Sequence, residues 1–170
     1  MHRTQLSSGI ATGIGGLPHR DAVDAATFVL RNMELPAIPT LPRRSPAEGS
    51  MAQAMVGMQG ITVGQYGSIA VDATLVDPLA PIVTDLDHDA FLGFRTFLEL
   101  AHEQQFVGPV KWQFVGPVSF GLALMRAGVP MSEAFESAVR CVRARLQHLL
   151  DAVSLALPQS QQLVFIEEPA

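Results

Sequence analysis

Short β-forming runs alternate along this chain with amphipathic helical segments, and this alternation restricts the fold more than any other feature. Each β-like run ends in glycine, proline or a charged residue, and the four runs are roughly residues 9–14, 37–41, 110–115 and 163–167. Apolar residues recur at helical spacing in the segments between them, at residues 21–33, 47–58 and 87–105 and from Ser132 onward. We expect Asp21 and Ser132 to cap the first and the last of these helices. Such alternation predicts an α/β fold in which crossover helices cover a parallel sheet.

The composition predicts one domain with more apolar surface than its own core needs. The chain has 170 residues, of which 48% are apolar and only 16% are charged. Ordinary soluble domains have about a quarter charged residues. We therefore expect residues 1–170 to form a single domain, with a β-hairpin inserted at about residues 61–72, where a glycine-containing run alternates.

Charge and cysteine content restrict the compartment and the partners. The single cysteine, Cys141, excludes an internal disulfide and fits a reducing cytoplasm. The net charge of −5, with Lys111 as the only lysine, argues against a nucleic-acid partner. No apolar run reaches the 18 residues or more of a membrane span, and no signal peptide is visible, so we expect no membrane association.

The first candidate binding segment is the glycine-rich turn after the first β-like run. Gly13 and Gly15 invite a dinucleotide-binding interpretation, but the third glycine of that fingerprint is Pro18 here, so the pattern fails. We instead expect Gly15 and Gly16 to let a ligand approach the backbone closely, with His19 facing the mouth of the site. The alternative is an ordinary strand-to-helix turn with an exposed histidine.

Charged residues at two other run ends form a second group of candidates. Arg43 and Arg44 lie in a proline-rich loop and are suited to binding carboxylate or phosphate groups. Glu167 and Glu168 end the last run, and neighbouring strand residues point to opposite sides, so one carboxylate should face the mouth. That carboxylate could bind a substrate amine or act as an acid or base. The alternative for both pairs is a salt bridge between them.

Two further residues carry weaker signals. Ser119 follows Gly116 and Pro117 and could cap the next helix, whose free N–H groups would face the mouth. Cys141 lies in a helical segment beside an apolar stripe, without histidine or cysteine at ligand spacing, so we interpret it as a structural thiol. Sequence spacing alone assembles no zinc site.

Four stretches together resemble the catalytic barrel of the cobalamin-independent methionine synthases. "TGIGGLPHRD" resembles the IGSFPQT-type opening of that domain, and "QYGS" resembles its SYGSR segment. "FVGPVSF" resembles its TGPVT segment, and "FIEEPA" resembles its IDEPA segment. The short methionine-synthase-II-like members, whose superfamily includes the uroporphyrinogen decarboxylases, are also similar through "LPRRSP".

The resemblance implies the N-terminal half of a (β/α)8 TIM-type barrel, with about four β/α units. It implies a cytoplasmic S-methyltransferase of methionine biosynthesis, which moves a methyl group from a folate or another donor to a zinc-bound thiol such as homocysteine. Ile14, Gly15 and Gly16 would then lie along the homocysteine backbone, and Glu167 would receive its ammonium group. Arg43, Arg44, His19 and Ser119 would line the mouth.

In the resembling family the zinc ligands follow the IDEPA segment. We therefore expect zinc in the full-length family but none bound by this chain alone, which would be inactive by itself. A decarboxylase-like lyase, with Arg43 and Arg44 clamping substrate carboxylates, is the alternative enzyme. A non-catalytic half-barrel module is the other alternative, and it would associate with itself or with a complementary barrel half.

Overall fold

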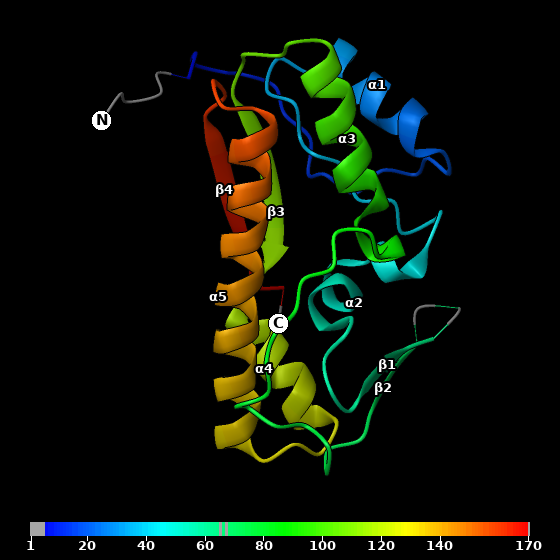
Figure 1. Ribbon diagram of the computed structural model, residues 1–170, viewed down its shortest axis with the longest axis vertical. Helices are drawn as coiled ribbons and strands as arrows, with labels where there is room; N and C mark the ends of the chain where they lie inside the picture. The colour runs from blue at the N-terminus through cyan, green and yellow to red at the C-terminus, as the bar shows by residue number, and fades with distance from the viewer. Residues whose placement is uncertain (1–5, 65, 67, 170) are drawn as a thin grey trace.

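The computed structural model describes residues 6–64, 66 and 68–169, and it contains two separate two-stranded sheets packed with helices (Figure 1). Gln65, Gly67 and Ala170, which belong to two of the quoted motifs, lie outside the described residues. The strands are β1 (Ile61–Val63), β2 (Ile69–Val71), β3 (Val110–Val115) and β4 (Gln162–Glu167). The helices are α1 (Ala22–Asn32), α2 (Ser50–Met55), α3 (Leu92–Glu103), α4 (Pro117–Arg126) and α5 (Met131–Ala156), with short 3-10 turns η1 (Pro46–Glu48) and η2 (Asp89–Phe91).

The central element is the parallel pair formed by β3 and β4. The register runs from Val110 opposite Gln162 to Val115 opposite Glu167, and α4 and α5 supply the crossover between the two strands. On one face of β3, three side chains are buried in the main core, namely Val110, Trp112 and Phe114. In Figure 1 the long α5 runs along the β3–β4 sheet, with α3 and α1 stacked beside it. Among the described residues, no helix is both long enough and apolar enough to cross a membrane.

The predicted half barrel is wrong. The described residues form a small α/β structure with only two sheets of two strands each. The runs at 9–14 and 37–41 form no strand and contribute only isolated parallel bridges, which join Thr12 to Leu35, Gly16 to Thr40 and Ala37 to Lys111. The expectation of a complementary barrel half as partner is withdrawn with it.

The residues of these two runs explain why they do not continue as strands. Pro36 and Pro39 lack the N–H group that a strand ladder needs, so the second run can bond only at intervals. Gly15 has a φ of 112°, which turns the first run out of the extended conformation. The second run is largely buried, as its apolar pattern suggests, whereas none of residues 9–14 is buried, and neither run forms a continuous ladder.

Local chemistry explains where α1, α2 and α5 begin. Asp21 caps α1 as predicted, because its carboxylate accepts a hydrogen bond from the N–H of Asp24 at 2.9 Å. The helix predicted over 47–58 is shorter, since Gly49 separates η1 from α2. Ser132 does not cap α5, because Pro130 occupies the capping position and Ser132 already lies in the first turn.

The buried side chain of Arg145 joins α5 to the end of α2. Its Nε donates to the carbonyl of Ala54 at 2.8 Å, and its Nη2 donates to the carbonyl of Val56. Arg145 is only 1% exposed, although it lies in a helix whose other buried residues are mostly apolar or small. The last carbonyls of α2 have no partner within their own helix, so Arg145 satisfies groups that burial would otherwise leave unpaired.

Replacement of Arg145 by methionine should therefore destabilise the fold. The stem would still be filled, but two buried carbonyls would lose their donor, which costs about 2–4 kcal/mol of unfolding free energy. Urea unfolding followed by circular dichroism measures the change. Arg31→Met, on the exposed side of α1, is the matched control and should change stability by less than about 0.5 kcal/mol. Equal effects of the two substitutions would contradict the assignment.

Candidate functional site

The ammonium group of Lys111 lies at the centre of the candidate site. Its Nζ donates to the carbonyls of Gly13 at 2.8 Å and Ile14 at 3.1 Å, and to the side-chain oxygen of Gln113 at 3.0 Å. The same atom lies 4.8 Å from the centre of the Phe165 ring. The only lysine of the chain thus ties the glycine segment to β3 and faces an aromatic ring of β4.

The surroundings of Lys111 change its pKa and occupy all of its hydrogen-bond donors. Burial lowers the pKa of the Lys111 ammonium, and the negative charge of Glu167 partly offsets this effect. All three of its N–H donors have partners within the protein. Lys111 is therefore a structural tie that positions the glycine segment.

The glycine segment runs along the second extended run. The N–H of Thr40 donates to the carbonyl of Gly15, and the N–H of Leu17 donates to the carbonyl of Thr40, both at 3.0 Å. Gly15 is buried with a positive φ, and a Cβ there would meet Gln113 at 3.4 Å. By contrast, the Ile14 side chain is 74% exposed. Ile14 and Gly16 are thus exposed to solvent, whereas Gly15 is buried next to Gln113 of β3.

Glu167 and Glu168 diverge, as alternation along a strand requires. Glu167 is opposite Val115, at the carboxyl edge of the sheet, on the same face as Lys111 and Phe165. Within the described part of the chain, Glu167 forms no salt bridge; the predicted alternative of a bridge to Arg43 or Arg44 is not seen. A partly exposed carboxylate is thus available at the strand end.

The Glu168 carboxylate lies at the N-terminus of α4. Its carboxylate accepts hydrogen bonds from the backbone N–H groups of Val118 at 3.0 Å and Ser119 at 2.6 Å. Burial by itself raises the pKa of Glu168, but the N–H groups of Ser119 and Val118 outweigh this and hold the pKa below its usual value. A Cβ on Gly116 would lie 2.1 Å from the Glu168 Oε1 atom, so a side chain at that position would displace the carboxylate. The anion site that a free helix end would offer is filled by the chain's own carboxylate.

Ser119 does not cap the helix as predicted. The N-cap of α4 is Gly116, and Ser119 lies inside the first turn. Its hydroxyl is buried without a hydrogen-bond partner among the described atoms. The residue contributes its backbone N–H to the Glu168 carboxylate, and its side chain has no assigned role.

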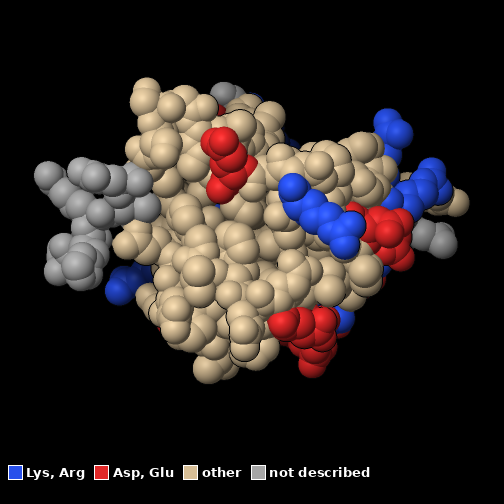
Figure 2. Space-filling view, turned by 90° about the horizontal axis from the view of Figure 1, so that it is seen from above, with Lys and Arg blue, Asp and Glu red and all other residues tan. Residues whose placement is uncertain are grey.

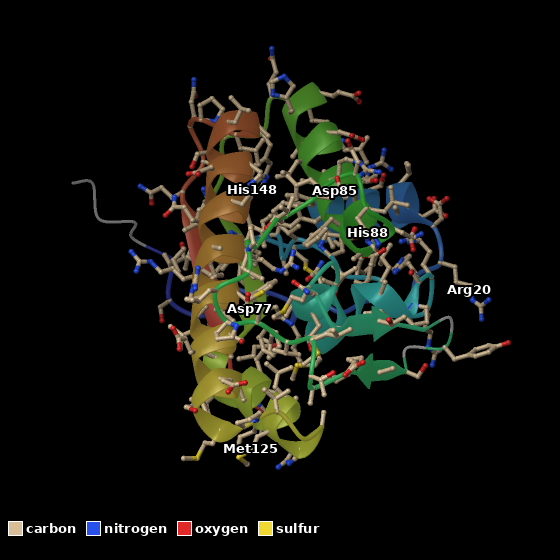
Figure 3. All side chains as sticks on the ribbon, turned by 60° about the horizontal axis from the view of Figure 1, so that its bottom comes forward. Arg20, Asp77, Asp85, His88, Met125 and His148 are labelled. Atoms are coloured by element: carbon tan, nitrogen blue, oxygen red, sulfur yellow. The ribbon has the colours of Figure 1, made fainter. Side chains whose placement is uncertain are left out.

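His19 packs against Phe28 of α1. Its ring lies 5.4 Å from the ring of Phe28, and its buried Nδ1 has no partner among the described atoms. Arg20, the next residue, is exposed and projects outward from the α1 side of the molecule (Figure 3).

The two adjacent arginines have different surroundings. Arg44 pairs with the carboxylates of Glu48 at 2.6 Å and Asp89 at 2.7 Å. Burial raises the pKa of Glu48, and the neighbouring Arg44 charge counteracts this effect. Glu48 also accepts the N–H of Leu41 at 3.0 Å, so the cluster fixes the loop. Arg43 is exposed, and the structure does not bring the two guanidinium groups together as a clamp.

The described residues do not fit a metal centre. No three histidine, cysteine, aspartate or glutamate side chains in this part of the chain lie close enough to hold a metal ion. Cys141 is buried near the carbonyl of Ala54 at 3.4 Å, and burial raises the pKa of its thiol. A zinc-bound thiolate is therefore not assigned to these residues.

One cavity lies at the ends of α3 and α5, away from the candidate site. It measures about 430 Å³ and is lined by His102, Phe106, Leu157 and neighbouring residues, between the end of α3 and the end of α5. Figure 2 looks onto this end of the molecule, where uncharged side chains dominate the surface.

Sequence reasoning missed Lys111 and Gln113 as positioning residues. Lys111 was noted only as the single lysine, although a charged residue inside an otherwise apolar strand was an available signal. Gln113 gave no such signal, because its role depends on the return of residues 13–15 to the sheet.

A comparison of the chain with protein-family models, with curated proteins and with solved structures found no match.

The contact between Glu168 and α4 predicts a specific pH dependence. The folded-state pKa lies below the usual value, so the stabilisation is present above about pH 4.5 and is lost as the pH falls through the folded pKa. Glu168→Gln should lower stability at pH 7 and flatten the loss of stability between pH 5 and pH 3. Urea midpoints measured across this range test the effect. Glu136→Gln, at an exposed position of α5 beyond its first turn, is the control and should keep the wild-type profile.

Proposed function

We propose that this chain binds the amino-acid part of a small thiol substrate, such as homocysteine, in an S-methyltransferase of the kind its motifs resemble. One observation carries the proposal. The glycine segment and the last β-run, which resemble substrate-binding motifs, converge on Lys111, so that Ile14–Gly16 and Glu167 lie at the same sheet.

The chemistry of this edge suits an ammonium group. Glu167 is the carboxylate near the glycine segment that lacks an ion-pair partner among the described residues, whereas Glu168 is held by α4. A carboxylate binds an ammonium through charge-assisted hydrogen bonds, each stronger than a neutral one. Phe165 is 48% exposed on the same face and offers an apolar contact to the methylene groups of the substrate.

The methyl-transfer step is not assigned to these side chains. In the resembling family zinc lowers the pKa of the thiol and holds it as the nucleophilic thiolate. The described residues do not fit such a centre. The role proposed for them is to bind and orient the amino acid, with a folate or another compound as the methyl donor of the complete reaction.

The alternative lyase receives no support from the arginine geometry. A carboxylate clamp needs two free guanidinium groups, but Arg44 is held by Glu48 and Asp89.

Titration of the isotope-labelled chain with homocysteine, followed by NMR, tests the proposal. We expect the amide signals of Ile14, Gly16 and Glu167 to shift. Glu167→Gln should raise the Kd about tenfold or more, because a hydrogen bond to a charged group contributes about 1.5–3 kcal/mol. Glu133→Gln is the control and should bind like the wild type.

A second ligand sharpens this experiment. 4-Sulfanylbutanoate has the thiol and carboxylate of homocysteine but no ammonium group, so it should bind poorly to the wild type and be insensitive to Glu167→Gln. Equal binding of the two ligands, or shifts confined to residues far from the sheet edge, would exclude the proposed site.

A further inference from the structure

The outer edge of β4 presents backbone groups that no described residue pairs with. β4 bonds on its other side to β3, where the carbonyls of Gln161 and Glu167 accept the N–H groups of Val110 at 2.9 Å and Gly116 at 2.7 Å. Because bonding alternates along a strand, the N–H and C=O groups of Gln162, Val164 and Ile166 point away from β3. In Figure 1, β4 forms the margin of this sheet, beside α5.

The edge also lacks the features that usually prevent strand pairing. Between Gln162 and Ile166 there is no charged residue and no proline. Phe165 and Ile166 are 48% and 46% exposed, on opposite faces of the strand. A groove of about 390 Å³ lies next to the edge, and Ile166 lines it together with Val139, Leu146 and Leu150 of α5. An apolar surface thus continues from the strand onto the helix.

We propose that a second copy of the chain pairs with this edge, β4 against β4, antiparallel about a two-fold axis at Val164. This inference does not depend on the proposed substrate. In this register Val164 lies opposite Val164 of the other copy, and Gln162 lies opposite Ile166 of the other copy. The outward backbone groups of the two strands therefore meet. Leu163 then lies beside Phe165 of the other copy.

The charges of β4 permit this register. Glu167 falls opposite Gln161 of the second copy, and no carboxylate faces another across the strands. Like charges directly opposite each other would destabilise the pair. Self-pairing therefore meets no electrostatic obstacle within the strand.

The charges of α5 favour the same axis. Gln162 donates to the carbonyl of Leu150 at 3.0 Å, and Ile166 shares the groove with Leu146, so Val164 lies level with the part of α5 around Gln147. A two-fold axis at that level runs the two α5 helices antiparallel. Exposed Arg143 and Asp151 lie four residues before and after Gln147, on the same stripe. The axis therefore brings Arg143 of each copy near Asp151 of the other.

Analytical ultracentrifugation of the full chain across a concentration series tests the proposal, with a reversible dimer as the expected result. Arg143→Glu places like charges across the axis and should raise the dimer Kd about tenfold or more. The double variant R143E/D151R reverses both charges and should restore the Kd to within about threefold of the wild type. Arg31→Glu, on exposed α1, makes the same charge change and should leave the Kd unaltered.

Hydrogen exchange provides an independent measurement of the strand pairing. The amides of Gln162, Val164 and Ile166 should become more protected as the protein concentration rises, whereas those of Leu163 and Phe165, which point to β3, should not change. A monomer at every concentration would overturn the proposal. Dimerisation without rescue by the double variant, or without added protection at Val164, would place the interface elsewhere.

Discussion

The enclosed ammonium of Lys111 is the contact on which the arrangement of the sheet edge depends. It joins β3 to carbonyls of the glycine segment, 97 and 98 residues earlier in the chain. The segments at 9–14 and 37–41 form only isolated bridges, so a continuous ladder does not hold them. A charged group with three satisfied donors supplies part of the cohesion that the missing backbone bonds would give.

Two of the charged groups predicted to act on a ligand are bound within the protein itself, and so is Lys111. Arg44 is bound by Glu48 and Asp89, and Glu168 closes the N-terminus of α4. Lys111 is bound by backbone carbonyls and Gln113. Of the two adjacent glutamates, Glu167 is therefore the one without an ion-pair or hydrogen-bond partner for its carboxylate among the described residues, which is why the proposed site is centred on it.

The sequence predicted elements better than it predicted their assembly. The α/β class, α1 with its Asp21 cap and the extended character of residues 110–115 and 163–167 all followed from local patterns. The half barrel did not, because apolar periodicity reports burial and says nothing of whether neighbouring backbones can bond. Pro36 and Pro39 lack the backbone N–H groups that strand pairing needs, so this stretch bonds to its neighbours only at intervals.

The sequence by itself determined where α1 begins and that residues 110–115 and 163–167 are extended, because these features depend on local spacing and capping. Only the tertiary structure decided the roles of the charged residues. Lys111, Arg44 and Glu168 each found a partner distant in sequence or in another element. Such pairings depend on how elements pack, and for buried Lys111 an unpaired charge would be far costlier than one in water.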